Sequence, residues 1–143
     1  EGSKEGDQEA AREAFALFGR EAGNAMAIAV SLTDSLVVIG GGLTGASKYI
    51  MPSLLDEMRS TLKTIDGDDV PRVQMRVFDL DDELEFAKFV VGDSRPLKIY
   101  GSEETVTYNP MKRTGVAISK LGASKAISIG AYVYALEMID SEE

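Results

Sequence analysis

Apolar side chains recur every three or four positions near the start of the chain, which predicts an amphipathic helix over residues 7–30. Asp7 is placed to cap the first turn, because an aspartate there accepts hydrogen bonds from free backbone N–H groups. Gly19 and Gly23 lie four positions apart within this helix, and each weakens it by about 1 kcal/mol. Two such glycines predict either close packing against a neighbouring helix or a kink.

A short apolar run at residues 36–39 follows and predicts a buried strand of the parallel kind. It leads into a glycine-rich loop, after which residues 46–50 predict a single turn. The helical pattern then restarts at Met51-Pro52, because proline is tolerated at the first position of a helix. Residues 67–71, with the sequence GDDVP, are typical of a loop.

The second half of the chain alternates between strand-like and helix-like patterns. Residues 73–78 predict a strand, whereas residues 84–91 fit a strand or a helix equally well. Residues 96–109 predict a hairpin around GSEE, and residues 115–119 predict a further strand. Residues 122–138 are apolar on nearly every face, which predicts a helix buried on all sides.

The composition narrows the chemistry that this chain can carry. Its 143 residues predict one domain, or a part of a larger protein cut at a domain edge. The formal net charge of −9, with no cluster of Lys or Arg, argues against direct contact with nucleic acid. The chain has neither Cys nor His, which excludes disulfides, Cys/His zinc sites, a histidine base and a cysteine nucleophile. No apolar run reaches the roughly 18 residues of a membrane helix, and the first residues do not resemble a signal peptide.

The glycine-rich loop lies within LVVIGGGLTGA and matches G-x-G-x-x-G by letter, through Gly40, Gly42 and Gly45. A dinucleotide-binding unit also needs an acidic residue about 20 positions beyond the loop. Here the second strand ends near Asp79, which lies 79 − 45 = 34 positions beyond Gly45, so the spacing argues against that unit. A phosphate-binding P-loop needs Gly-Lys followed by Ser or Thr, whereas Lys48 follows a serine.

A third reading of the loop remains. Three consecutive glycines are more than a tight turn requires, and glycine lets a ligand approach the bare backbone closely. The loop therefore favours close approach of a flat or bulky ligand over a purely structural turn.

Two charged clusters have simpler explanations than a site. Asp79, Asp81 and Asp82 follow a strand and favour a solvated loop over a metal site, because no matching ligands occur elsewhere. Lys112-Arg113 favours a surface basic pair over a phosphate contact.

Several motifs, taken in order, resemble the ROK family of bacterial glucokinases, related sugar kinases and sugar-responsive repressors. They are G-x-x-x-G-N-A-M-A at residues 19–27, VVIGGG at residues 37–42, and L-G-x-x-x-A-x-x-x-G-A-Y-x-x-A between Leu121 and Ala135. Gly130-Ala131 in the last motif would permit close packing of a helix on a sheet. Residues 79–118 fit the resemblance least well.

The resemblance implies an α/β fold, an actin-like ATPase (ribonuclease H-like) lobe with a mixed β-sheet flanked by helices. It implies that residues 1–143 form a single domain, the C-terminal lobe, with the N-terminal lobe absent from this chain. The parent protein is then expected to be a cytoplasmic, ATP-dependent hexose kinase. Its Mg²⁺ would be held mainly by the missing lobe, and a homodimer surface is left open.

By the same resemblance, the adenosine end of ATP is expected to contact Gly40, Gly41, Gly42, Leu43 and Thr44. The Thr44 hydroxyl is more readily explained as a cap of the following turn than as a ligand contact. No residue is assigned a catalytic or metal-binding role. The D-x-G-x-T phosphate motif, the sugar-site aspartate, the sugar-binding element and the Cys-rich zinc motif of the family are all missing, so the fragment alone is expected to be inactive. The alternative is the effector-sensing domain of a ROK repressor, with its DNA-binding segment upstream.

Overall fold

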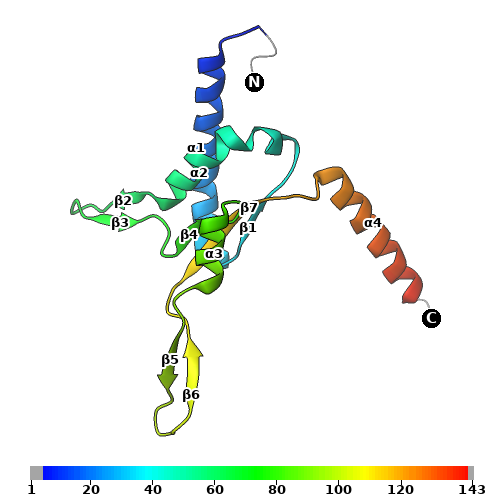
Figure 1. Cartoon of the computed structure of the whole chain (residues 1–143). Coiled ribbons are helices and arrows are strands. Elements are labelled where there is room, and N and C mark those ends of the chain that lie inside the picture. The colour runs from blue at the N-terminus through cyan, green and yellow to red at the C-terminus, as the bar shows by residue number, and fades with distance from the viewer. Residues whose placement is uncertain (1–4, 142–143) are drawn as a thin grey trace.

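The computed structural model describes residues 5–141 of the chain (Figure 1). The helices are α1 (Gln8–Thr33), the short 3₁₀ helix η1 (Gly42–Ala46), α2 (Ser47–Arg59), α3 (Glu83–Val91) and α4 (Ala123–Asp140). The strands are β1 (Val37–Ile39), β2 (Thr61–Lys63), β3 (Asp69–Pro71), β4 (Arg76–Asp79), β5 (Arg95–Lys98), β6 (Thr105–Tyr108) and β7 (Arg113–Ile118).

Helix α1 begins where the sequence predicts. The Asp7 side chain accepts hydrogen bonds from the backbone N–H groups of Glu9 and Ala10, at 2.9 and 3.0 Å. These bonds satisfy donors that the first turn of a helix otherwise leaves free. The predicted cap is therefore confirmed, and α1 runs without interruption to Thr33.

The two glycines of α1 form a flat surface against which α2 packs. Both are buried, and a Cβ added to Gly19 or Gly23 would lie 2.4 or 2.5 Å from a backbone carbonyl oxygen of α2. Because a side chain of any size would push the helices apart, the close-packing prediction is confirmed and the kink is not needed.

Arg72 ties the β2–β3 hairpin to this pair of helices. Its guanidinium donates to the Asn24 side chain of α1 at 2.6 Å and to the Ser60 hydroxyl at 3.0 Å. It also pairs with the Glu57 carboxylate of α2 at 2.8 Å, and both partners are about four-fifths buried. The asparagine in the first of the ROK-like motifs therefore has a structural role.

A three-stranded parallel sheet lies beside α1 and α2, in the order β1-β7-β4. Its central strand carries the fully buried Val116. The α/β class is confirmed. The single mixed sheet is not observed, because β2–β3 and β5–β6 form separate antiparallel hairpins. The core is built from apolar residues of α1, α2 and the sheet: Ala27, Val30, Ile50, Met51, Leu54, Leu55, Met58, Val73, Val77 and Val116.

Helices α2 and α3 cover opposite faces of this sheet. Val77 joins the core shared with α1 and α2, whereas the neighbouring Phe78 contacts Phe89 of α3, with ring centroids 5.7 Å apart. Successive strand residues point to opposite faces. The chain therefore leaves β1 toward one face and β4 toward the other.

The buried Thr114 of β7 ties the middle of the sheet to the segment that precedes β1. Its hydroxyl donates to the carbonyl oxygen of Ser35 at 2.8 Å. Replacing Thr114 by valine keeps the shape but removes this bond, so we expect the free energy of unfolding to fall by about 1 kcal/mol. Urea denaturation of the 143-residue chain would measure the change. An unchanged midpoint would mean that the bond contributes nothing to stability.

Two predictions from the sequence are wrong, and one ambiguous segment is resolved. Helix α2 does not restart at Pro52 but is continuous with that proline inside it. Its buried apolar face against α1 outweighs the cost of an internal proline, about 3 kcal/mol. The sequence predicts a loop over residues 67–71, yet Asp69–Pro71 pairs with Thr61–Lys63 as β3. The ambiguous residues 84–91 are helical, with Asp82 as the cap.

Helix α4 is observed where a helix is predicted, but the prediction that it is buried is wrong for this chain. Every residue of α4 is exposed, and Figure 1 shows the helix standing away from the sheet. Gly130 has no atom within 4 Å of an added Cβ, so it does not serve helix-to-sheet packing here. The apolar composition predicts burial, but within residues 5–141 nothing packs on this helix. No helix in that described part is long and apolar enough to cross a membrane.

Candidate functional site

The glycine loop lies at the carboxyl end of β1, directly before η1. Gly41 has a φ of 100°, a conformation that favours glycine. Its carbonyl oxygen accepts from the backbone N–H of Thr44 at 3.2 Å and from the Thr44 hydroxyl at 2.8 Å. The threonine hydroxyl therefore bonds within the loop itself, while the cap position of α2 is taken by Ala46 without a side-chain bond.

Beside the loop lies a mostly apolar pocket of about 120 Å³. Three of the five predicted site residues line it, namely Gly40, Leu43 and Thr44, whereas Gly41 and Gly42 do not. The remaining walls come from α1, α2 and the ends of β1 and β7: Phe18, Ala22, Met26, Ile39, Ser47, Ile50, Met51, Leu54 and Ile118. Its volume is below the roughly 300 Å³ at which ordinary ligand pockets begin, so it suits one flat ring system rather than a whole nucleotide.

Gly41 and Gly42 present open backbone next to this pocket. A Cβ added to either would meet no atom within 4 Å, so no packing inside the chain requires glycine there. The φ of Gly41 explains that residue, but Gly42 does not have a positive φ. The fold therefore gives no reason for glycine at position 42, whereas a ligand lying on the loop would give one.

A second, more polar pocket of about 340 Å³ adjoins the first through Ser47, Met51 and Ile118. Asp79 and Asp81 line it after β4, and Lys120 lines it after β7. The carboxyl ends of parallel strands meet at one edge of a sheet, where ligands of open α/β folds bind. The sequence singled out the aspartates but missed Lys120, because only the pairing of β7 with both other strands brings it to this edge.

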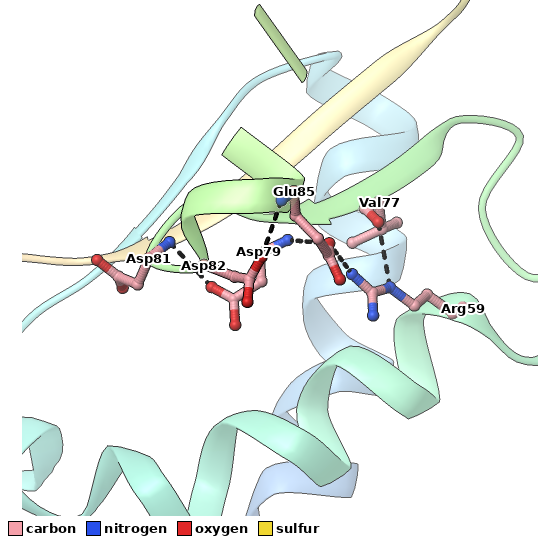
Figure 2. A network of polar contacts seen from close by, with 6 residues as sticks. All are labelled: Arg59, Val77, Asp79, Asp81, Asp82 and Glu85. Carbon is pink, nitrogen blue, oxygen red and sulfur yellow. Dashed lines mark hydrogen bonds and ion pairs between the residues drawn. The ribbon is translucent and has the colours of Figure 1, made fainter. Parts of the chain in front are cut away.

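The three aspartates of the acidic cluster make structural hydrogen bonds (Figure 2). Asp79 accepts from the Asp81 backbone N–H at 3.0 Å, and Asp82 accepts from the Glu85 backbone N–H at 2.8 Å. Asp81 accepts from the backbone N–H of Ile118 at 2.7 Å, which joins this turn to β7. Residues 5–141 contain no group of three acidic side chains arranged to hold a metal ion.

Arg113 of the basic pair is half-buried rather than fully on the surface. Its guanidinium lies 5.2 Å from the ring centroid of Phe89, and its Nη1 is buried without a hydrogen-bond partner among residues 5–141. The side chain thus packs on α3, away from the glycine loop. It is part of the fold, and the surface-pair interpretation is wrong for this residue.

The connectivity also argues against the dinucleotide-binding interpretation. In that fold, the strand after the loop and its helix pairs in parallel with the strand before the loop. Here α2 is followed by β2, which pairs only with β3 in an antiparallel hairpin, and β1 pairs with β7. The literal G-x-G-x-x-G match therefore has no βαβ unit around it.

No protein-family model matches the chain, and no curated protein matches it. Among solved structures, the chain is similar to a glucokinase from Parabacteroides distasonis ATCC 8503, with 46% sequence identity and a TM-score of 0.81. The match covers 95% of this chain and 36% of the glucokinase, so the chain spans about a third of that protein's length. Over almost all of its residues, this chain is therefore similar in sequence and in fold to a segment of that glucokinase.

Proposed function

We propose that this chain is the C-terminal lobe of an ATP-dependent, glucokinase-type sugar kinase of the ROK family, and that its glycine loop binds the adenosine end of ATP. The observation that carries the proposal is the similarity to a glucokinase at 46% identity over 95% of the chain. The ordered ROK-like motifs support it, and they imply an actin-like ATPase fold for the whole protein.

The geometry of the loop supports the assignment of adenosine to this edge of the sheet. The apolar pocket has room for one flat ring system such as a purine, and Gly40, Leu43 and Thr44 form the wall next to the open backbone of Gly41 and Gly42. A base inserted there would leave its ribose and phosphates outside the pocket, across the loop. The ATP supplies the phosphoryl group, and the residues of this lobe bind and orient its adenosine.

The remaining parts of the reaction are assigned to the other lobe. The chain has no histidine, and its described residues provide no metal-binding group. In the proposed parent, an aspartate of the missing lobe takes the proton from the sugar hydroxyl, and Mg²⁺ is held mainly there. The chain alone is then expected to be inactive. Because the proposed reaction consumes ATP, the proposed location is the cytoplasm.

The test is sugar-dependent ATP turnover by the longer protein that contains this chain. We expect ADP release to depend on a hexose, with glucose as the first candidate, and we expect none from the 143-residue chain by itself. A coupled assay over a panel of hexoses would measure both. If the longer protein turned over ATP with none of them, the kinase proposal would be wrong. A DNA-binding segment upstream together with sugar-dependent DNA binding would then favour the repressor.

A further inference from the structure

Among residues 5–141, strand β4 is an edge strand, since it pairs with β7 on one side only. The backbone N–H groups of Arg76 and Leu80 donate to carbonyl oxygens of Lys112 and Val116, so these residues face the neighbouring chain segment. Alternate residues of a strand turn their backbone groups to opposite sides. Val77 and Asp79 therefore turn theirs outward, where a further strand would pair.

Both of these outward positions are already bonded to side chains (Figure 2). Arg59, the last residue of α2, donates from Nε to the carbonyl oxygen of Val77 at 3.1 Å. Glu85, in the first turn of α3, accepts from the backbone N–H of Asp79 at 2.7 Å. The same carboxylate oxygen pairs with Nη2 of Arg59 at 2.5 Å, so the two side chains form one unit.

This unit makes the same two bonds as one residue of an added parallel strand. Such a residue would donate its N–H to the carbonyl oxygen of Val77 and accept from the N–H of Asp79. We propose that the Arg59–Glu85 pair imitates that residue and ends the sheet at β4, so that a second copy of the chain cannot add its own β4 edge there.

The local helix geometry supports a role for Glu85 beyond capping. Asp82 and Glu85 stand in the positions of a capping box, and the first half of the box is present, because Asp82 accepts from the Glu85 N–H. In the usual box the glutamate reaches back to the backbone N–H of the cap residue. Here its side chain extends to Asp79 and Arg59 instead, so α3 is fastened to the strand edge.

A groove beside the β4 edge indicates why the Arg59–Glu85 pair would be needed to prevent pairing with another chain. An open groove of about 640 Å³ runs beside β4, and it is lined by apolar side chains as well as by Arg59 and Glu85. Within residues 5–141 no side chain bonds to the backbone of β1 at the other end of the sheet. An unpaired strand edge beside such a groove is a site where another chain can pair.

The test replaces both partners in the full chain, as R59A/E85A. We expect this variant to self-associate at concentrations about tenfold lower than the unmodified chain, as measured by sedimentation velocity. The matched control is K98A/E103A, which removes an ion pair of the same two charge types on the exposed β5–β6 hairpin and should leave association unchanged. Adding Asp79→Pro to the double variant removes the outward N–H donor, so association through β4 should be lost again.

Two outcomes would overturn the proposal. One is a folded R59A/E85A chain that associates no more than the control, and the other is association that survives Asp79→Pro. If the double variant did not fold, hydrogen exchange in the unmodified chain would decide instead. The Asp79 amide should exchange about as slowly as the Leu80 amide in the β7 ladder, and exchange of Asp79 at the rate of an unprotected amide would show that the pair does not close the edge.

Discussion

Replacing Gly19 or Gly23 by alanine is expected to lower the free energy of unfolding by about 1–3 kcal/mol at each site. A new Cβ would lie 2.4 Å from the carbonyl oxygen of Ile50 or 2.5 Å from that of Leu54. These are backbone atoms, so neither can move without shifting α2 away from α1. Alanine raises helix propensity by about 1 kcal/mol, but the overlap outweighs that gain. Because both sites share one helix contact, the double variant should show a coupled loss.

Urea denaturation followed by circular dichroism would measure this loss, and α4 offers a matched control. Gly130 is also a helical glycine, but an added Cβ there meets no atom within 4 Å. Gly130→Ala should therefore stabilise the chain, by about 0.5–1 kcal/mol, through propensity alone. If Gly19→Ala were also stabilising, the helices would not be in the close contact that the structure shows.

Local patterns predicted the elements whose causes are local. The cap at Asp7 and the helix that follows it depend on consecutive residues, and so does the hairpin around GSEE. The glycines of α1 predicted close packing but not its partner. The predicted start of that partner, α2, is wrong. Proline ordinarily interrupts a helix, and only the buried face of α2 against α1 outweighs this effect.

Long-range relations account for what the sequence could not predict. The edge position of β4 follows from its pairing with β7, which lies more than thirty positions further along the chain. Arg59 and Glu85 gain their contacts with β4 only from that pairing, and the capping-box position of Glu85 does not predict them. For helix α4 the sequence predicts a contact that is not observed. Its apolar composition predicts burial, but residues 5–141 provide no surface that covers it.

The glycine loop lies between these two cases. Its place after a strand was predictable from consecutive residues, and the pocket formed by Gly40, Leu43 and Thr44 with α1 and α2 was not. Gly41 is accounted for by its backbone conformation, with a φ of 100°. Gly42 has neither a positive φ nor a neighbour that excludes a side chain. The fold alone therefore does not require glycine at position 42, whereas the proposed nucleotide does.

Replacing Gly42 by alanine is accordingly expected to leave the stability of the lobe unchanged and to weaken ATP binding by the longer protein about tenfold or more. The new methyl group would occupy space that the adenosine needs above the loop, and a misfit of about 1.4 kcal/mol already gives a tenfold loss of affinity. Gly45→Ala is the matched control, because Gly45 also lies in η1, with no positive φ and no atom within 4 Å of an added Cβ. Titration with ATP would compare the two variants, and thermal unfolding would check that both are folded. Equal affinities for the two variants would mean that the nucleotide does not lie against Gly42, even if the protein phosphorylates sugars.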